Sequence, residues 1–270
     1  MLTRTQQFLS DHPVCCFCGG EAPSEEEDHI PGRDFFKGRH WPEGYSFPAC
    51  KDCNASTRHD EMLVNVFSRA LPLEDSEEQA AECKRVLTGL KNNFPHILAA
   101  LQPRANEVRA IIKALGVQRL PGQFLSEMPF LSADHDAVQV SLGRYGLKLG
   151  CALFYKHLAR LLPKEAGVLV KWQTNVRLSL DGLPEGLVSL TGVPGMLNRG
   201  KSILNDQFQY RYGLQDDGNA AVFFIGFRLS LYYSLTCVND VRQLPEFPPE
   251  VRVWRPRDLQ KPHLTPAMQR

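Results

Sequence analysis

The sequence predicts an α+β protein in which a small metal-bound module is followed by a helical region and then an antiparallel sheet. Three observations predict this order. Two C-x-x-C pairs lie within residues 15–53, apolar residues recur at helical spacing between residues 54 and 162, and apolar and polar residues alternate from about residue 167. We expect three segments: residues 1–72, residues 76–244 and a proline-rich, extended tail at 245–270.

The module is predicted from the cysteines. Cys15 pairs with Cys18 and Cys50 with Cys53 at C-x-x-C spacing, and two such turns supply the four thiolates of a tetrahedral structural Zn²⁺ site. A pair of disulfides is the alternative, which a reducing compartment disfavours. The other cysteines are expected to be a spectator in the first turn and buried apolar side chains elsewhere: Cys16, Cys83, Cys151 and Cys237.

The helical region is predicted from apolar stripes. Residues 54–71 form one stripe, with Asn54 able to cap the start and Pro72 after the end. Residues 76–101 form a second helix with a break at Pro95, because proline removes a helical hydrogen bond. Residues 104–115 and 134–162 have the same spacing, and residues 1–14 are a short lead-in with some helical character.

The sheet is predicted from alternation. Strand patterns occur at 168–172, 176–180 and 187–192, and again at 207–214 and 220–227, where QDDGN at 215–219 is a credible turn. The segment 218–239 has the length of a membrane helix, but it alternates and contains Arg228, so we expect a β-hairpin. The N-terminal residues lack the apolar core of a secretory signal. We therefore expect a cytoplasmic protein with no membrane partner.

The charge is unevenly distributed. The chain of 270 residues has a formal net charge of +1, which alone argues neither for nor against a nucleic-acid partner. Residues 1–75 hold 7 Lys and Arg against 13 Asp and Glu, so the excess of basic residues lies after residue 75. A bound polyanion is expected to be attracted mainly by the C-terminal part, whereas the acidic run at 25–28 suits a cation.

The ordered combination of C-x-x-C, D-H-I-P at 28–31 and C-x-x-C-N followed by a helix resembles the HNH endonucleases, and in particular their zinc-bound subgroup. The resemblance covers residues 15 to about 65, roughly a quarter of the chain. It implies a ββα-metal module that hydrolyses phosphodiester bonds of DNA, most often double-stranded. Such nucleases often serve restriction, antiviral (phage) defence or mobile elements. The C-terminal region would then restrain the nuclease or bind a regulatory protein or trigger.

The resemblance also implies residue roles. Asp28 corresponds to a ligand of the catalytic Mg²⁺ or Mn²⁺, His29 to the general base, and Asn54 to the second ligand of the cation. The chemistry agrees, because a histidine can take a proton from water at neutral pH and a hard cation prefers oxygen ligands. Each residue has an alternative: Asp28 in a solvated acidic run, His29 in a solvated loop, and Asn54 as a helix cap.

Further candidates surround these residues. Arg33 and Arg58 can hold phosphates or be ordinary surface charges. His59 and Glu61 can supply a further ligand, support a ligand, or lie on a solvated helix face.

Two departures from the family pattern leave activity open. Tyr45 stands where relatives carry an asparagine that orders the loop of the base, and Thr57 stands where they carry a lysine. The alternatives to an endonuclease are a non-catalytic, zinc-dependent nucleic-acid-binding protein and an interaction subunit whose zinc module is structural.

Overall fold

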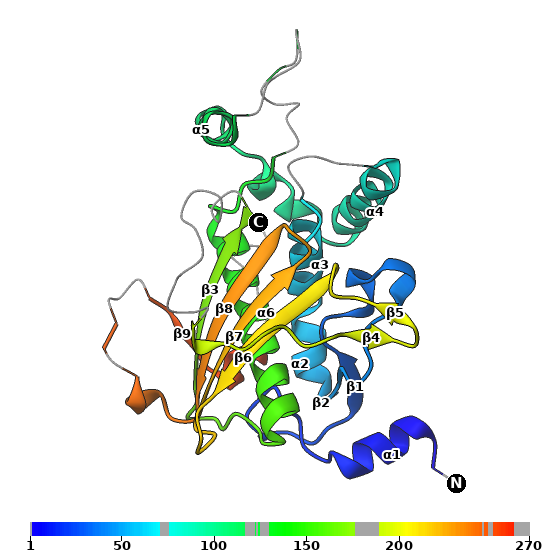
Figure 1. The fold of residues 1–270 in the computed structure, drawn as a ribbon, viewed down its shortest axis with the longest axis vertical. Helices are drawn as coiled ribbons and strands as arrows, with labels where there is room; N and C mark the ends of the chain where they lie inside the picture. The colour runs from blue at the N-terminus through cyan, green and yellow to red at the C-terminus, as the bar shows by residue number, and fades with distance from the viewer. Residues whose placement is uncertain are drawn as a thin grey trace.

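The computed structural model describes residues 2–70, 76–116, 122, 124, 130–175, 189–244, 246–247 and 251–261. It is a mixed helix and sheet protein with antiparallel sheets, as expected. A curved five-stranded sheet packs on one long helix, and the N-terminal elements lie on the other side of that helix (Figure 1). The expected strand at 176–180 and residues 187–188 of that expected at 187–192 lie outside the described residues. Residues 189–192 are described and do not form a strand, so that prediction was wrong there.

The N-terminal part holds a short hairpin and a helix pair. Strands β1 (Glu26–His29) and β2 (Ser46–Ala49) are antiparallel, with Asp28 opposite Phe47 and His29 opposite Ser46. The predicted helix at 54–71 is two helices that begin and end earlier. The remaining elements of this part are α1 (Arg4–Asp11), η1 (Arg33–Phe35), η2 (Lys37–Arg39), α2 (Lys51–Ser56) and α3 (Arg58–Phe67).

The break between α2 and α3 is at Thr57, whose φ and ψ are −103° and 0°. Its hydroxyl group lies 3.1 Å from the carbonyl oxygen of Cys53, so the side chain competes locally with the helical ladder. The prediction of one continuous helix was therefore wrong at this residue.

The middle helices follow the apolar stripes closely. The second predicted helix ends at Asn93, just before Pro95, because proline lacks the N–H that would continue the helical hydrogen bonds. Pro95 is the first residue of a 3₁₀ turn. The longest helix, α6, is buried over most of its length and accounts for the stripe predicted at 134–162. These elements are α4 (Glu77–Asn93), η3 (Pro95–Ile97), η4 (Ala99–Leu101), α5 (Ala105–Leu115) and α6 (Asp136–Leu158).

The main sheet has the strand order β6-β7-β8-β3-β9. The segment at 218–239 is the hairpin β7–β8, which confirms the reading drawn from its alternation. Among the described residues, no helix has the length and apolar character needed to cross a membrane. The elements are β3 (Gly167–Thr174), β4 (Asn198–Arg199), β5 (Ser202–Ile203), β6 (Phe208–Leu214), β7 (Ala220–Phe227), β8 (Leu231–Val238), η6 (Val241–Gln243), β9 (Val253–Trp254) and η7 (Pro256–Leu259).

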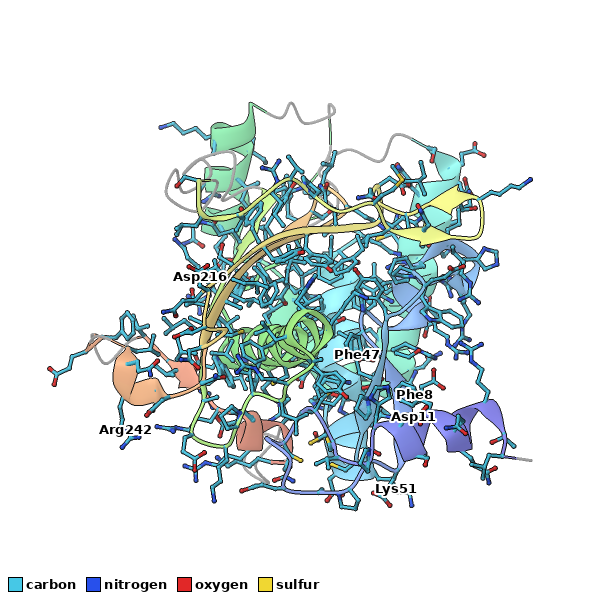
Figure 2. All side chains as sticks on the ribbon, turned by 60° about the horizontal axis from the view of Figure 1, so that its bottom comes forward. Phe8, Asp11, Phe47, Lys51, Asp216 and Arg242 are labelled. Carbon is cyan, nitrogen blue, oxygen red and sulfur yellow. The ribbon has the colours of Figure 1, made fainter. Side chains whose placement is uncertain are left out.

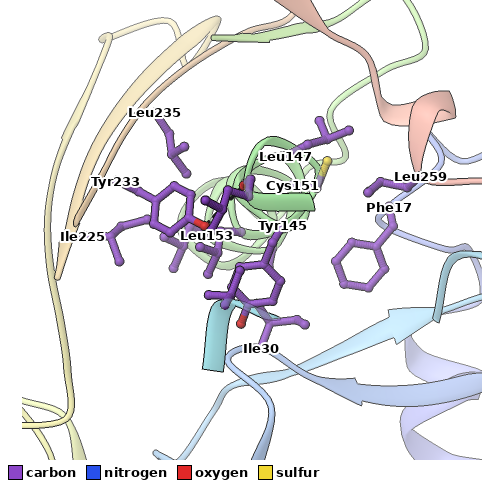
Figure 3. Close-up of a cluster of buried hydrophobic side chains, with 14 of the residues drawn as sticks. Phe17, Ile30, Tyr145, Leu147, Cys151, Leu153, Ile225, Tyr233, Leu235 and Leu259 are labelled. Atoms are coloured by element: carbon purple, nitrogen blue, oxygen red, sulfur yellow. Dashed lines mark hydrogen bonds between the residues drawn. The ribbon is translucent and has the colours of Figure 1, made fainter. Parts of the chain in front are cut away.

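One buried cluster extends from Cys15 to Leu259. Figure 2 views α6 almost along its axis, with the sheet curving around one side and Phe47 of β2 on the other. Figure 3 shows Ile225, Tyr233 and Leu235 of the sheet on one side of α6 and Phe17 and Leu259 on another. The core is thus continuous from the N-terminal elements to β9 and η7 in the tail. The division into segments at 72–76 and 245 remains a prediction.

Helix α6 approaches the sheet closely because its sheet-facing positions are glycines. A Cβ at Gly146 would overlap Val170 of β3, and a Cβ at Gly143 would overlap Trp254 of β9. We expect Gly146→Ala to lower the free energy of unfolding by about 1–3 kcal/mol in urea denaturation, because overpacking outweighs the better helix propensity. The matched control is Gly89→Ala in α4, where nothing lies within 4 Å, and it should gain about 0.5–1 kcal/mol. Equal effects of the two substitutions would contradict this packing.

A second prediction concerns pH. The ring of His157, in the last turn of α6, stacks on Tyr212 at 3.8 Å, and its Nε2 lies 2.8 Å from the Tyr210 hydroxyl. Burial, with a smaller effect of Lys156, lowers the pKa of His157 to about 4. A depressed histidine pKa stabilises the fold above the unfolded value of about 6.5, and this contribution is lost as the pH falls toward 4.

The unfolding free energy of His157→Phe, which keeps a stacking ring, should therefore fall less than that of the wild type between pH 7 and pH 4.5. Urea denaturation at both pH values measures the difference. An identical loss in both proteins would show that His157 does not titrate in this range.

Candidate functional site

Four cysteines converge at one end of the N-terminal part. Cys15 and Cys18 lie in the turn before β1, Cys50 caps α2 and Cys53 lies in its first turn. All four are buried, and their sulfur atoms lie within 4.8 Å of one another. Hydrogen bonds from Cys15 and Cys53 lower the pKa of the Cys18 thiol, and the same hydrogen bonds raise the pKa of Cys15 and Cys53, so a thiolate is favoured at Cys18. Four buried cysteines this close can bind a metal ion such as zinc.

The turn around the first pair depends on two glycines. Gly19 and Gly20 have φ of +73° and +83°, a backbone region that side chains disfavour. A Cβ on Gly19 would also lie 2.8 Å from the backbone nitrogen of Lys164. The first C-x-x-C turn therefore packs directly on the segment between α6 and β3.

His29 lies at the end of β1 with both ring nitrogens in contact. Nδ1 is 3.2 Å from Ser46 Oγ, and Nε2 contacts the guanidinium of Arg33. Since a guanidinium can only donate, Nε2 must be the acceptor and Nδ1 the N–H that donates to Ser46. Burial, followed by the positive charge of Arg33, lowers the pKa of His29, so the imidazole is neutral at pH 7.

Trp41 packs beside this histidine. The two ring centres are 4.6 Å apart, and the guanidinium groups of Arg33 and Arg199 lie 4.0 and 4.4 Å from the centre of the Trp41 ring. Arg199 belongs to the β4–β5 hairpin, so the C-terminal part reaches the surroundings of His29.

Asp28 is buried and faces a lysine from α6. Its Oδ2 lies 2.7 Å from Nζ of Lys148, which is completely buried. The same ammonium lies 3.0 Å from Oε1 of Glu61 and donates to the Thr57 hydroxyl at 2.8 Å. Burial alone would lower the pKa of Lys148, but the two carboxylates outweigh it and raise the pKa. The ammonium form is therefore strongly favoured.

A second buried ion pair lies one helical turn away. Nε of Arg144 in α6 donates to Oδ2 of Asp60 at 2.9 Å, and the same guanidinium donates to the carbonyl oxygens of Asp258 and Ser56. Asp60 and Glu61, which are neighbours in α3, are thus paired with Arg144 and Lys148, four residues apart in α6.

Most of the residues expected at the site line one cavity of about 540 Å³. Its walls combine the imidazole of His29 with four carboxylates and three guanidinium groups, which are provided by Glu27, Asp28, Asp34, Glu61, Arg33, Arg39 and Arg58. Arg39 pairs with Asp34 at 3.4 Å. His59 also lines it, with its ring stacked on Phe94 at 4.4 Å. Arg33 and Arg58 make no ion pair within 4.0 Å with any carboxylate in the described part of the chain.

Asn54 lies elsewhere. Its Nδ2 donates to Oε2 of Glu26 at 2.6 Å, and it is not among the residues that line the cavity. Glu26 and Asp28 lie on the same face of β1, two residues apart along the strand. Asn54, which is bound to Glu26, is therefore separated from the carboxylate of Asp28. The structure brings Glu61, rather than Asn54, to the same ammonium as Asp28.

Tyr45 and Thr57, which stand where the resemblance predicts an asparagine and a lysine, both make contacts. The carbonyl oxygen of Tyr45 accepts the N–H of Ile30, next to His29, and the Tyr45 hydroxyl donates to that of Tyr210 at 2.9 Å. The hydroxyl group of Thr57 accepts a hydrogen bond from the ammonium of Lys148.

Lys148 and Arg144 were missed by the sequence reading. The signal was available, because two cations four residues apart interrupt an otherwise apolar and glycine-rich helix. Cations inside a buried helix require buried partners, and acidic residues at 28, 60 and 61 were the candidates.

Comparison of the chain with protein-family models, with curated proteins and with solved structures finds no match.

The cysteine cluster gives a prediction. Cys50→Ser should lower the zinc content of the purified protein from about one ion per chain, because one of four ligands is lost. Cys16→Ala is the matched control, since Cys16 is equally buried but lies outside the cluster. Metal analysis by inductively coupled plasma mass spectrometry measures both. Full zinc retention in Cys50→Ser, or equal loss in Cys16→Ala, would contradict the assignment of the four ligands.

Proposed function

We propose that the protein is a metal-dependent endonuclease of the HNH type that hydrolyses phosphodiester bonds of DNA. The observation that carries the proposal is one cavity lined by the neutral imidazole of His29, by four carboxylates that include Asp28 and Glu61, and by three guanidinium groups. Hydrolysis of a phosphodiester needs a base for water and positive charge for the phosphate, and these groups supply both. The β1–β2 hairpin followed by α2 and α3, with four cysteines, is consistent with a ββα-metal module.

His29 is the general base in this proposal. Its Nε2 carries the lone pair, which accepts a hydrogen bond from Arg33 in the absence of substrate. Arrival of a phosphate would draw the Arg33 guanidinium onto the phosphate oxygens, since bidentate pairing with phosphate is stronger than a bond to neutral imidazole. Water can then take the place of Arg33 at Nε2.

The reaction proceeds by in-line displacement. The water oxygen forms a bond to phosphorus while its proton passes to Nε2 of His29. The bond from phosphorus to the leaving oxygen breaks, and the alkoxide takes a proton from solvent water. Arg58 and Arg39 lie on the same cavity and can bind the flanking phosphates, which positions the strand.

A divalent cation fits the carboxylates of the cavity better than it fits the pair expected from the resemblance. Asp28 and Glu61 each give one oxygen to Lys148, which leaves Oδ1 and Oε2 for a ligand, and hard cations prefer carboxylate oxygens. Asn54 is engaged with Glu26. Bound at Asp28 and Glu61, Mg²⁺ or Mn²⁺ would stabilise negative charge on the phosphate and the leaving oxygen.

Double-stranded DNA as substrate, and a role in defence, restriction or mobile elements, rest on the resemblance. The regulatory role of the C-terminal part has support of its own. Lys148 on α6 and Arg199 on the β4–β5 hairpin both reach the candidate site, so a partner that displaces either element would alter it.

The test is cleavage of supercoiled plasmid by zinc-loaded protein with Mg²⁺ or Mn²⁺. His29→Ala should lower the rate by about 10²–10⁴-fold, the usual effect of losing a general base, and should keep zinc content and folding. His12→Ala is a matched control, because His12 bonds Tyr155 and does not line the cavity.

Wild-type rates in folded His29→Ala would refute the role of His29. No cleavage by the wild type with either cation, together with salt-sensitive DNA binding, would favour the non-catalytic binding protein.

A further inference from the structure

The most unusual group near the candidate site is the ammonium of Lys148. It is completely buried, it comes from α6, and three acceptors surround it: Asp28 Oδ2 at 2.7 Å, Thr57 Oγ1 at 2.8 Å and Glu61 Oε1 at 3.0 Å. The ring of Phe17 lies on a further side, 5.5 Å from Nζ. The ammonium donates hydrogen bonds to Thr57 and Glu61. Its contact with Asp28 is an ion pair that leaves Oδ2 without an aligned hydrogen bond.

Complete burial limits what Lys148 can do. With no exposed surface, its ammonium can neither contact a phosphate nor protonate a leaving oxygen. It can act only through Asp28 and Glu61, which both line the cavity, and it is therefore a positioning residue.

Packing alone does not explain a lysine at this position. Burying an ammonium and two carboxylates costs several kcal/mol per ion before their attraction is counted, and apolar side chains of similar volume are often as stabilising. A methionine would fill the same space without that cost. The lysine does something that methionine would not: it fixes one oxygen of each carboxylate and removes one unit of negative charge between them.

We propose that Lys148 is the resident counter-ion of the candidate cation site. By pairing with one oxygen each of Asp28 and Glu61, Lys148 leaves the other oxygen of each facing the cavity and lowers the affinity of the two carboxylates for a divalent cation. The inference rests on the proposed function for the use of the cation. With the ammonium present, the net charge of Lys148, Asp28 and Glu61 is −1. Without the ammonium, the two carboxylates would bind a cation with a net charge of −2. Weaker coordination, by one oxygen of each carboxylate, leaves coordination positions of the cation open for phosphate and water.

The test is Mn²⁺ binding by isothermal titration calorimetry to the zinc-loaded full-length chain, with plasmid cleavage measured alongside. Lys148→Met should bind Mn²⁺ at least about tenfold more tightly than the wild type, because the competing positive charge is gone. Its cleavage at saturating Mn²⁺ should fall at least about tenfold, because the carboxylates then take up positions needed by the substrate. Lys156→Met is the matched control on the same helix, since Lys156 contacts the carbonyl oxygen of Gly44 rather than a carboxylate. Its Mn²⁺ affinity should stay at the wild-type value.

Glu61→Gln gives a second readout in case Lys148→Met does not fold. The amide keeps an oxygen for the Lys148 ammonium but removes a charged ligand, so Mn²⁺ binding should weaken at least about tenfold. Unchanged or weaker Mn²⁺ binding in folded Lys148→Met, unchanged binding in Glu61→Gln, or no Mn²⁺ binding by the wild type would each overturn the proposal. Opposite shifts in the two variants without any plasmid cleavage would uphold the role of Lys148 and refute the nuclease. Plasmid cleavage by the wild type without these shifts in Mn²⁺ affinity would support the nuclease and refute the role of Lys148.

Discussion

The buried ammonium of Lys148 is the interaction on which the arrangement of the rest depends. It must lie within ion-pairing distance of Asp28 on β1 and Glu61 on α3, so α6 has to pass directly beside both elements. Leaving any of the three charges unpaired in the interior would be strongly destabilising. The orientation of the β1–β2 hairpin relative to the helix pair is thus fixed by a side chain from a distant part of the chain.

The two faces of α6 have different roles. Gly143, Gly146 and Gly150 lie along one face, where the lack of side chains lets the sheet approach. Arg144 and Lys148 lie on another face and reach the neighbouring carboxylates of α3. At 100° per residue, the two cationic residues lie roughly 100–160° around the helix from the three glycines. One helix can therefore pack on the sheet with one face and reach the candidate site with another.

Local features of the sequence predicted the local structure well. The C-x-x-C pairs converge, the helix break at Pro95 occurs, and the alternating segments at 168–172, 207–214 and 220–227 lie in the antiparallel sheet, because spacing and proline geometry act over a few residues. Asp28 and His29 were recognised as a pair, but only the structure shows that Asp28 turns to Lys148 and His29 to Ser46 and Arg33. Asn54 was expected beside Asp28, and its partner Glu26 depends on how the hairpin meets α2. Lys148 is 120 positions from Asp28, and no local pattern links the two.

The central claim is that Lys148 and a divalent cation share the carboxylates of Asp28 and Glu61. The most direct measurement is an anomalous difference map from crystals of the zinc-loaded protein soaked in Mn²⁺. We expect a manganese peak bonded to oxygens of Asp28 and Glu61, with Nζ of Lys148 still paired to the other oxygen of each. A peak at Asn54 and Glu26 instead, or one that takes the place of the ammonium, would contradict it.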